Sequence, residues 1–528
     1  MKDAFDVLTA TASDLQKKLT DGDISSVQIV QQYLAQIEKH NDYLRAVLEL
    51  SPHAQEIALK LDSERKSGKV RSPLHGIPVL LKDNIAVSPD LGLKTTAGSF
   101  ALIESIPKGN ASVVDQLLKA GMIVLGKANL SEFANFKGSD IQPGWSPRGG
   151  QTQSAYVRGG LVPDGTILGH SSPGGSSTGC AVGLSAGFAT LALGTETDGS
   201  LITPANRAAL YAMRPTQGLV PQGGVIPIAN ILDTVGPMAK SVEDLANLLT
   251  VIVDPSHPNV PKNGYAAALT KTWDGIRVGF LDPGTFFFAP DVIKPNQNAT
   301  TQMETEIRAA YQKIKTYLPQ AQENVSYVTL DDLEYKGRDI LSIFMMNDFK
   351  NDLENYLRGL ATSKVKTLED IIQFNKDNKD EELPPFYPNQ DALESALNAA
   401  NKLSLSEREE AISWMRQAGG PSGIDKYLKK YNVDVIIGPA DCECTEPPAA
   451  AGKSEQSPSR VFKMTAKGYP VATMPLSTLD LNGRPFGVSA VASAHQEELL
   501  IKVMSAWEAT FPPRSVPPTL RSAATSAI

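Results

Sequence analysis

The chain has 528 residues, of which 41% are apolar and 20% charged, and its net charge is −8 at neutral pH. This composition supplies a substantial core, and the lack of a long basic block disfavours binding to nucleic acid or to an anionic membrane surface. No uninterrupted apolar run of about eighteen residues predicts a membrane span, and residues 1–10 lack the apolar stretch of a secretory signal. We therefore expect a cytoplasmic protein, although a secreted chain whose signal has been removed has the same appearance.

The three cysteines are too few for a disulfide framework. Cys442 and Cys444 are separated by one residue, and no Cys or His pair lies nearby to complete a zinc site. We expect free thiols and no metal.

The first eighty residues predict helices, with apolar residues at helical spacing over 15–37 and Ser25 or Ser26 as the cap of the second helix. Residues 73–82 predict a turn that enters a buried strand ending at Lys82. A helix over 112–120 and a strand over 122–126 follow. This alternation predicts an α/β fold with helices on both faces of a sheet.

Residues 138–180 are rich in Gly, Ser and Pro, and irregular segments of this length in folded domains are more often functional than idle. Residues 290–430 are polar and helical in pattern, which predicts an insertion or cap over the main sheet. The chain then returns to strands and a closing helix, expected at 433–438, 471–476, 486–490 and 497–509. We expect a single domain over residues 1–528, with the helical insertion at 290–430.

Three features bear on chemistry. Lys82 ends an apolar strand, where it is either a solvated strand end or a buried lysine whose depressed pKa suits a neutral base. Residues 171–179 (SSPGGSSTG) are a linker, a phosphate cradle or a loop that approaches a reacting group. In residues 194–205, Gly199 before Ser200 permits a sharp turn that exposes a hydroxyl beside successive N–H groups, as acyl transfer requires. Taken alone, Lys82 and the Gly199–Ser200 turn favour a structural interpretation, whereas the apolar segments on both sides of 171–179 argue against a linker there.

Other nucleophile and base patterns are weaker. The single literal G-x-S-x-G match centres on Ser185, in an apolar setting that predicts a helix instead. The six histidines form no base or metal-ligand pattern, and His75 and His170 are explained by ordinary hydrogen bonding. The lack of a persuasive histidine base favours a serine mechanism driven by a lysine.

Taken together, three segments resemble the amidase signature family in order and spacing: 76–83 (GIPVLLKD), 173–179 (PGGSSTG) and 194–205 (GTETDGSLITPA). The family separates its two serines by 24 residues, as Ser176 and Ser200 are separated here. Further similar text lies at 126–134, 232–238, 468–470 and 483–487. Residues 349–353 and 367–375 resemble the subgroup that contains peptide amidases and the fungal and bacterial general amidases.

The resemblance implies a large central mixed β-sheet flanked by helices and a serine amidohydrolase that needs no cofactor. It makes Ser200 the nucleophile, Ser176 on a cis Gly175–Ser176 peptide the proton relay, and neutral Lys82 the base. The implied oxyanion hole is formed by the backbone N–H groups of Thr197, Asp198, Gly199 and Ser200. The implied substrate-binding positions are Gly175, Ser177, Thr195 and Ile202.

The sequence departs from the family pattern at several positions. Asp198 replaces a usual glycine, Thr178 and Cys180 replace smaller residues, and Ile202 stands where many relatives carry arginine. The last change favours a neutral, apolar acyl group, unless Arg207 or Arg214 replaces the missing cation.

The expected substrate is a small-molecule or peptide amide, with a homodimer left open as an oligomeric state. Two alternatives remain, namely a catalytically idle binding protein on the same scaffold and the ammonia-releasing chain of a glutamine-dependent amidotransferase, which works in a heteromeric complex.

Overall fold

The computed structural model describes residues 4–520 except 287, 289, 329–330, 401 and 442–467. Cys442 and Cys444 therefore lie outside the described residues. At the centre, a ten-stranded sheet has the strand order β1-β3-β2-β6-β8-β7-β13-β14-β12-β9. Its strands are β1 (Val47–Leu50), β2 (Pro78–Lys82), β3 (Ile123–Ala128), β6 (Leu191–Glu196), β7 (Tyr211–Arg214), β8 (Thr234–Ala239), β9 (Val278–Phe280), β12 (Val435–Pro439), β13 (Val471–Thr478) and β14 (Pro485–Val491).

The sheet is mixed. β3, β2 and β6 run parallel to one another, β12 runs parallel to β9, and the remaining neighbours pair antiparallel. Strands β2, β3 and β6 to β8 are buried along their whole length, as expected for strands covered on both faces. This architecture confirms the fold class predicted from the sequence.

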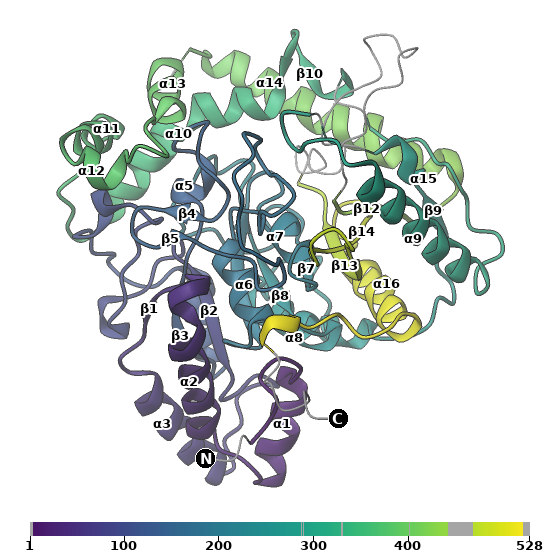
Figure 1. Cartoon of the computed structure of the whole chain (residues 1–528), viewed down its shortest axis with the longest axis horizontal. Helices are drawn as coiled ribbons and strands as arrows, with labels where there is room; N and C mark the ends of the chain where they lie inside the picture. The colour runs from purple at the N-terminus through teal and green to yellow at the C-terminus, as the bar shows by residue number, and fades with distance from the viewer. Residues whose placement is uncertain are drawn as a thin grey trace.

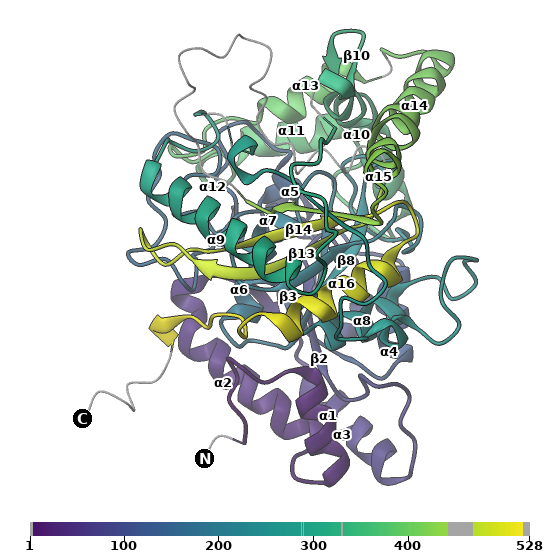
Figure 2. The ribbon, with the colours of Figure 1, turned by 90° about the vertical axis from the view of Figure 1, so that its right-hand side faces the viewer.

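Helices cover both faces of the sheet (Figures 1 and 2). α6 and α7 pack against the strands on one face, and α4, α8 and α16 pack together on the other. The helices of this central body are α1 (Ala12–Asp21), α2 (Ser26–Leu44), α3 (Ala54–Lys66), α4 (Ser112–Lys119), α6 (Thr178–Ser185), α7 (Ile202–Asn206), α8 (Val242–Ile252), α9 (Gln297–Lys315) and α16 (Glu497–Thr510). Ser25 caps α2, as the sequence predicted.

A helical segment lies along one side of the molecule, at the top of Figure 1. It contains α10 (Ile340–Gly359), α11 (Leu368–Asp377), α12 (Lys379–Glu382), α13 (Asp391–Ala399), α14 (Leu405–Gly419) and α15 (Asp425–Tyr431). α9, although it belongs to the same stretch of sequence, contributes Met303, Ile307 and Ile314 to the main core. The assignment of residues 290–430 to an insertion in a single domain stays a prediction.

Several short strands were not expected from the sequence. β1, an edge strand of the main sheet, interrupts the predicted helical start, and β10 (Glu334–Tyr335) with β11 (Arg338–Asp339) forms a hairpin inside the helical segment. Strands of two to four residues are too short for periodicity to separate them from helix or loop. A second two-stranded pair, β4 (Trp145–Ser146) and β5 (Gly150–Gln151), lies in the glycine-rich stretch.

No helix among the described residues is long and apolar enough to cross a membrane.

Candidate active site

The sheet topology brings Lys82 and the residues after β6 together. β2 and β6 are parallel neighbours, with Leu81 opposite Leu193, so their carboxyl ends meet at the same edge of the sheet. Lys82 is the last residue of β2, and Thr195 lies near the end of β6. Carboxyl ends of parallel strands are the usual place for sites in α/β sheets.

The Lys82 side chain is fully buried and contacts only neutral groups. Its Nζ lies 2.8 Å from Ser176 Oγ, 2.8 Å from Thr195 Oγ1 and 3.2 Å from the Thr195 carbonyl oxygen. Asn84 Nδ2 donates to the same Thr195 hydroxyl at 3.0 Å. Because no carboxylate contacts the ammonium directly, burial dominates and lowers the pKa of Lys82 to about 7.

Ser176 lies on a tightly packed loop ahead of α6. The Gly175–Ser176 peptide is cis, as the resemblance implied. Ser131 N–H donates to the Ser176 carbonyl at 3.2 Å. A Cβ atom on Gly175 would lie 2.7 Å from Ser131 Oγ and 3.0 Å from Pro143 Cβ, so only glycine fits there.

Ser200 lies in the turn between β6 and α7, with Gly199 before it at φ 80°. Its carbonyl accepts from Ser177 N–H at 3.1 Å, which ties the turn to the Ser176 loop. Its hydroxyl has no hydrogen-bond partner within the described part of the chain, and the residue is 7% exposed. The residue is therefore nearly buried, a small part of it remains exposed, and its hydroxyl is not committed to another described residue.

Backbone N–H groups around Ser200 divide into two sets. Glu196 Oε2 accepts from Leu201 N–H at 2.8 Å and from Ile202 N–H at 3.1 Å, which secures the start of α7. By contrast, the N–H groups of Thr197, Gly199 and Ser200 donate no hydrogen bond to any described residue. The turn thus holds unoccupied donors beside the Ser200 hydroxyl.

Asp233 supports the other side of this turn. Its carboxylate accepts from Thr197 Oγ1 at 2.6 Å and from the N–H groups of Ile228 and Ala229 at 2.8 and 3.1 Å. Burial raises the pKa of Asp233 to about 6, against the lowering effect of these hydrogen bonds.

The positions expected to bind substrate have structural contacts of their own. Ser177 Oγ donates to the Thr195 carbonyl at 3.0 Å, and Thr195 serves Lys82. Ile202 is 2% exposed and packs in a second core cluster with Ala229 and Leu232. The structure brings these residues to the site, and their contact with substrate stays a prediction.

Sequence reasoning missed several residues that shape the site. Asn84, Glu196, Asp233 and Ser131 each hold a backbone or hydroxyl group there, as described above. Arg207 donates to the carbonyl oxygens of Gly169 and Ser172, at 2.9 and 3.1 Å, and so fixes the glycine-rich loop. Signals for them existed in the sequence. Asn84 lies two residues after Lys82, Ser131, Glu196 and Asp233 lie in segments that resemble the family, and Arg207 was considered only as a replacement cation.

The serine and histidines that were set aside in the sequence analysis make structural contacts. Ser185 is buried in α6, where its hydroxyl donates to the Val182 carbonyl at 3.0 Å. His75 Nε2 and His170 Nε2 lie 3.0 and 2.8 Å from the carbonyl oxygens of Leu61 and Lys294, which are structural contacts. Within the described ranges, no three His, Cys, Asp or Glu side chains are grouped so as to hold a metal ion.

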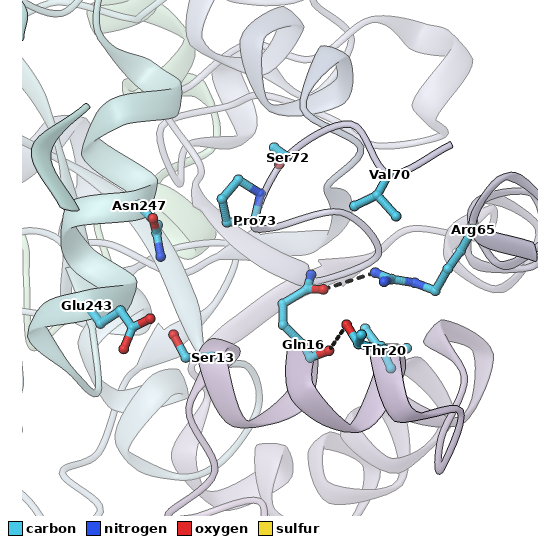
Figure 3. A pocket seen from close by; sticks show the side chains of 10 residues that line it. Ser13, Gln16, Thr20, Arg65, Val70, Ser72, Pro73, Glu243 and Asn247 are labelled. Atoms are coloured by element: carbon cyan, nitrogen blue, oxygen red, sulfur yellow. Dashed lines mark hydrogen bonds between the residues drawn. The ribbon is translucent and has the colours of Figure 1, made fainter. Parts of the chain in front are cut away.

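A separate cavity of about 460 Å³ lies between α1, the end of α3 and α8 (Figure 3). Its lining residues are Ser13, Gln16, Leu19, Thr20, Arg65, Val70, Ser72, Pro73, Glu243 and Asn247. Much of its polar surface is already bonded, since Gln16 Nε2 donates to the His75 carbonyl at 2.7 Å and Arg65 donates to Gln16 Oε1 at 3.0 Å. It shares no lining residue with the Lys82–Ser176–Ser200 arrangement.

The site and fold have close relatives. Residues 28–501 match the family model described as Amidase. A Schizosaccharomyces pombe protein described as a "putative amidase" is 32% identical over 94% of this chain and 85% of its own length. The native peptide amidase from Stenotrophomonas maltophilia is 32% identical over 96% of this chain and 98% of its own, with a TM-score of 0.80. A glutamyl-tRNA(Gln) amidotransferase chain of Chloroflexus aggregans is 34% identical over 56% of this chain and 57% of its own.

The family match at 28–501 includes the strands and loops that carry Lys82, Ser176 and Ser200. The S. pombe relative and the peptide amidase also cover nearly the whole chain, the helical segment included. The chain therefore belongs to the amidase signature family of amide-hydrolysing enzymes.

Proposed function

We propose that the protein hydrolyses a carboxamide through an acyl-enzyme on Ser200. Ser200 Oγ attacks the amide carbonyl carbon while its proton passes to Ser176 Oγ and the Ser176 proton passes to Lys82 Nζ. The proton then returns through Ser176 to the leaving nitrogen, and the C–N bond breaks to release ammonia or an amine. Water attacks the ester by the same route and frees the acid.

The observation that carries the proposal is the buried contact between Lys82 Nζ and Ser176 Oγ at 2.8 Å. A neutral amine has two N–H groups and one lone pair. The Thr195 carbonyl can only accept, so one N–H of the neutral amine points at it. The second N–H and the lone pair face two hydroxyl groups, and in the arrangement we propose the N–H goes to Thr195 Oγ1 and the lone pair accepts the Ser176 proton.

The turn around Ser200 supports an oxyanion hole. Backbone N–H groups of Thr197, Gly199 and Ser200, with that of Asp198, are the donors we assign to the tetrahedral oxyanion. Their role needs no reorganisation, because Glu196 and Asp233 already fix the turn on both sides. Donors fixed in advance in a site of low dielectric lower the barrier to acyl transfer, typically by several kcal/mol.

The proposed substrate is a primary or simple secondary amide with a neutral acyl group, such as a C-terminally amidated peptide or an aryl or alkyl amide. The peptide amidase likeness over the whole chain supports the first. Ile202, at a position where many relatives carry arginine, packs in an apolar cluster, which supports a neutral acyl group.

The amidotransferase alternative is less well supported, because that relative matches 56% of the chain whereas the amidase relatives match nearly all of it. An idle binding protein would have no need of a buried lysine beside an accessible serine. A cytoplasmic location and a homodimer stay predictions of the sequence.

Labelling with a fluorophosphonate, followed by mass spectrometry, tests the assignment. We expect one adduct on Ser200 in the parent and none in Ser200→Ala, whose kcat/KM for an amide falls by a factor on the order of 10⁴ or more. Ser185→Ala is the matched control and should label as the parent does. An adduct on Ser185, or activity retained in Ser200→Ala, would remove Ser200 from the mechanism.

A further inference from the structure

Three ionisable side chains meet in the protein interior, away from the proposed triad. Lys137 Nζ lies 2.6 Å from Glu132 Oε2 and 2.9 Å from Glu382 Oε2, and all three side chains are fully buried. Lys137 also donates to the Glu382 carbonyl oxygen. Two members follow β3, whereas Glu382 ends α12, about 250 residues later in the sequence. We call these three residues the Glu132 cluster.

The Glu132 cluster holds one cation against two carboxyl groups. Glu382 has the better-satisfied carboxylate, because it also accepts from Ser99 Oγ at 3.1 Å and from Phe100 N–H at 2.7 Å. Glu132 is paired with Lys137 and lies within hydrogen-bond reach of the Glu382 carboxylate, which two carboxyl groups allow when one of them is protonated. Burial, with the nearby Glu382 charge, raises the pKa of Glu132 well above its usual range. A proton on Glu132 leaves the cluster electrically neutral.

One end of this cluster leads directly to Ser176. Glu132 follows Ser131, whose N–H donates to the Ser176 carbonyl and whose Oγ accepts from Gly144 N–H at 2.9 Å. The next residues, Phe133 and Ala134, have φ values of 47° and 54°, which non-glycine residues rarely adopt. Such a backbone persists only where surrounding contacts enforce it.

The other end belongs to the helical segment. Ser139 N–H and Oγ donate to the Asp391 carboxylate at 2.7 and 2.6 Å, and the Tyr387 ring lies 4.5 Å from that of Trp145. Lys137 Nζ lies 5.5 Å from the Trp145 ring. α12 and α13 are thus attached to the loop that borders Ser176, with the Glu132 cluster as the buried part of the attachment.

We propose that Glu132, Lys137 and Glu382 are positioning residues for the hydrolytic reaction, which hold the Ser131 backbone and through it the Ser176 hydroxyl against Lys82. The inference rests on the proposed function. A misplaced Ser176 slows proton transfer without altering substrate contacts, so the cluster governs kcat and leaves KM alone.

Glu382→Ala is the informative variant, because it leaves a balanced Lys137–Glu132 pair and cuts the link to α12. The neighbouring, exposed Glu381 on the same helix supplies the control, Glu381→Ala. Fluorophosphonate titration first counts active Ser200, so that kcat refers to competent enzyme only. We expect Glu382→Ala to lower kcat per labelled serine roughly tenfold, with KM within about twofold. Glu381→Ala should match the parent.

Glu382→Gln keeps an acceptor for Phe100 N–H and should recover part of the kcat lost in Glu382→Ala. If Glu382→Ala does not fold, Glu382→Gln is the variant measured in its place. A parental kcat per labelled serine in both variants, or a loss confined to KM or to the labelled fraction, overturns the proposal. A parent that does not label at Ser200 contradicts the proposed function instead.

Discussion

Two lysines on neighbouring strands experience different surroundings. Lys82 ends β2, and Lys127 lies in β3 beside it, with Leu81 opposite Lys127 in the parallel ladder. Both side chains are fully buried. Lys82 meets two hydroxyl groups and a carbonyl. Lys127 Nζ donates to the Ile85 carbonyl, and it lies 3.2 Å from Thr95 Oγ1 and 3.9 Å from Asp83 Oδ1.

The difference lies in what surrounds each ammonium. Burial lowers both pKa values, to about 7 for Lys82 and about 8 for Lys127, where Asp83 opposes the shift. A depressed pKa therefore does not by itself identify a base. Lys82 contacts the Ser176 hydroxyl, whereas the hydroxyl beside Lys127, that of Thr95, donates to the Ile85 carbonyl at 3.5 Å, and a carboxylate lies close to Lys127 as well. We infer that a neighbouring hydroxyl with a proton to give, and not burial, separates the proposed base Lys82 from Lys127.

Exchanging each lysine for alanine tests this comparison most severely. Lys82→Ala should lower kcat/KM for an amide far more than for an ester of the same acyl group, because the amine leaving group needs a proton. General acid–base assistance is worth ~10²–10⁴-fold, and the amide/ester ratio should fall by an amount in that range. Lys127→Ala is the matched control and should lower both rates equally.

Steady-state kinetics on paired amide and ester substrates provide the measurement. Equal losses for the two substrates in Lys82→Ala would contradict the leaving-group role. A changed ratio in Lys127→Ala would make the second lysine a participant and break the comparison. Ser176→Ala should change the ratio in the same direction but less, because a water molecule can replace a relay hydroxyl in part.

Much of the fold is predictable because long patterned segments carry it. The strand before Lys82, the helix after Ala111 and the closing helix at Glu497 all follow from apolar runs of sufficient length. β1 and the β10–β11 hairpin do not. Pairing with the distant strand β3 decides β1, and the two-residue strands of the hairpin are too short to carry a pattern. The partner of Glu132 lies about 250 residues away, which no local pattern reveals.

The candidate site divides in the same way. Lys82, Ser176 and Ser200 were named from motifs, and the structure brings their loops together, with Lys82 and Ser176 in direct contact. The supporting residues Glu196 and Asp233 were not named as site residues, because the sequence alone does not show whether an acidic residue holds a backbone turn or a metal. Their function depends on which N–H groups face them, and only the folded chain specifies that.

Charge pairing also bears on substrate choice. Arg207 and Arg214 were the candidate replacements for the arginine missing at Ile202. Arg207 Nε lies 2.6 Å from Asp441, and Arg214 Nε lies 3.9 Å from Glu196, so both already face carboxylates. We expect kcat/KM for a neutral amide to exceed that for a carboxylate-bearing analogue by about 10²-fold, since an unpaired carboxylate pays several kcal/mol on burial. A malonamate-like amide and its neutral isostere give the comparison, and a preference for the anion would reveal a cation that these pairings leave available.

The smallest effect expected is a change in the pH profile, and it isolates Lys82 from its titrating neighbours. Because burial lowers the pKa of Lys82 to about 7, the neutral base forms as pH rises through 7, and kcat/KM should rise about tenfold per pH unit below that value and level off above it.

Asp233, whose pKa burial raises to about 6, is a second group that can set the rising limb of the profile. Asp233→Asn separates the two. Removal of the Asp233 charge, which raises the pKa of Lys82, moves a limb set by Lys82 to lower pH but keeps it, whereas a limb set by Asp233 disappears. Asp83→Asn removes the charge beside Lys127 and should further lower the pKa of that lysine, yet leave the kinetic midpoint within about half a pH unit of the parent. A midpoint that follows Asp83 would mean that Lys127, and not Lys82, supplies the kinetically visible base.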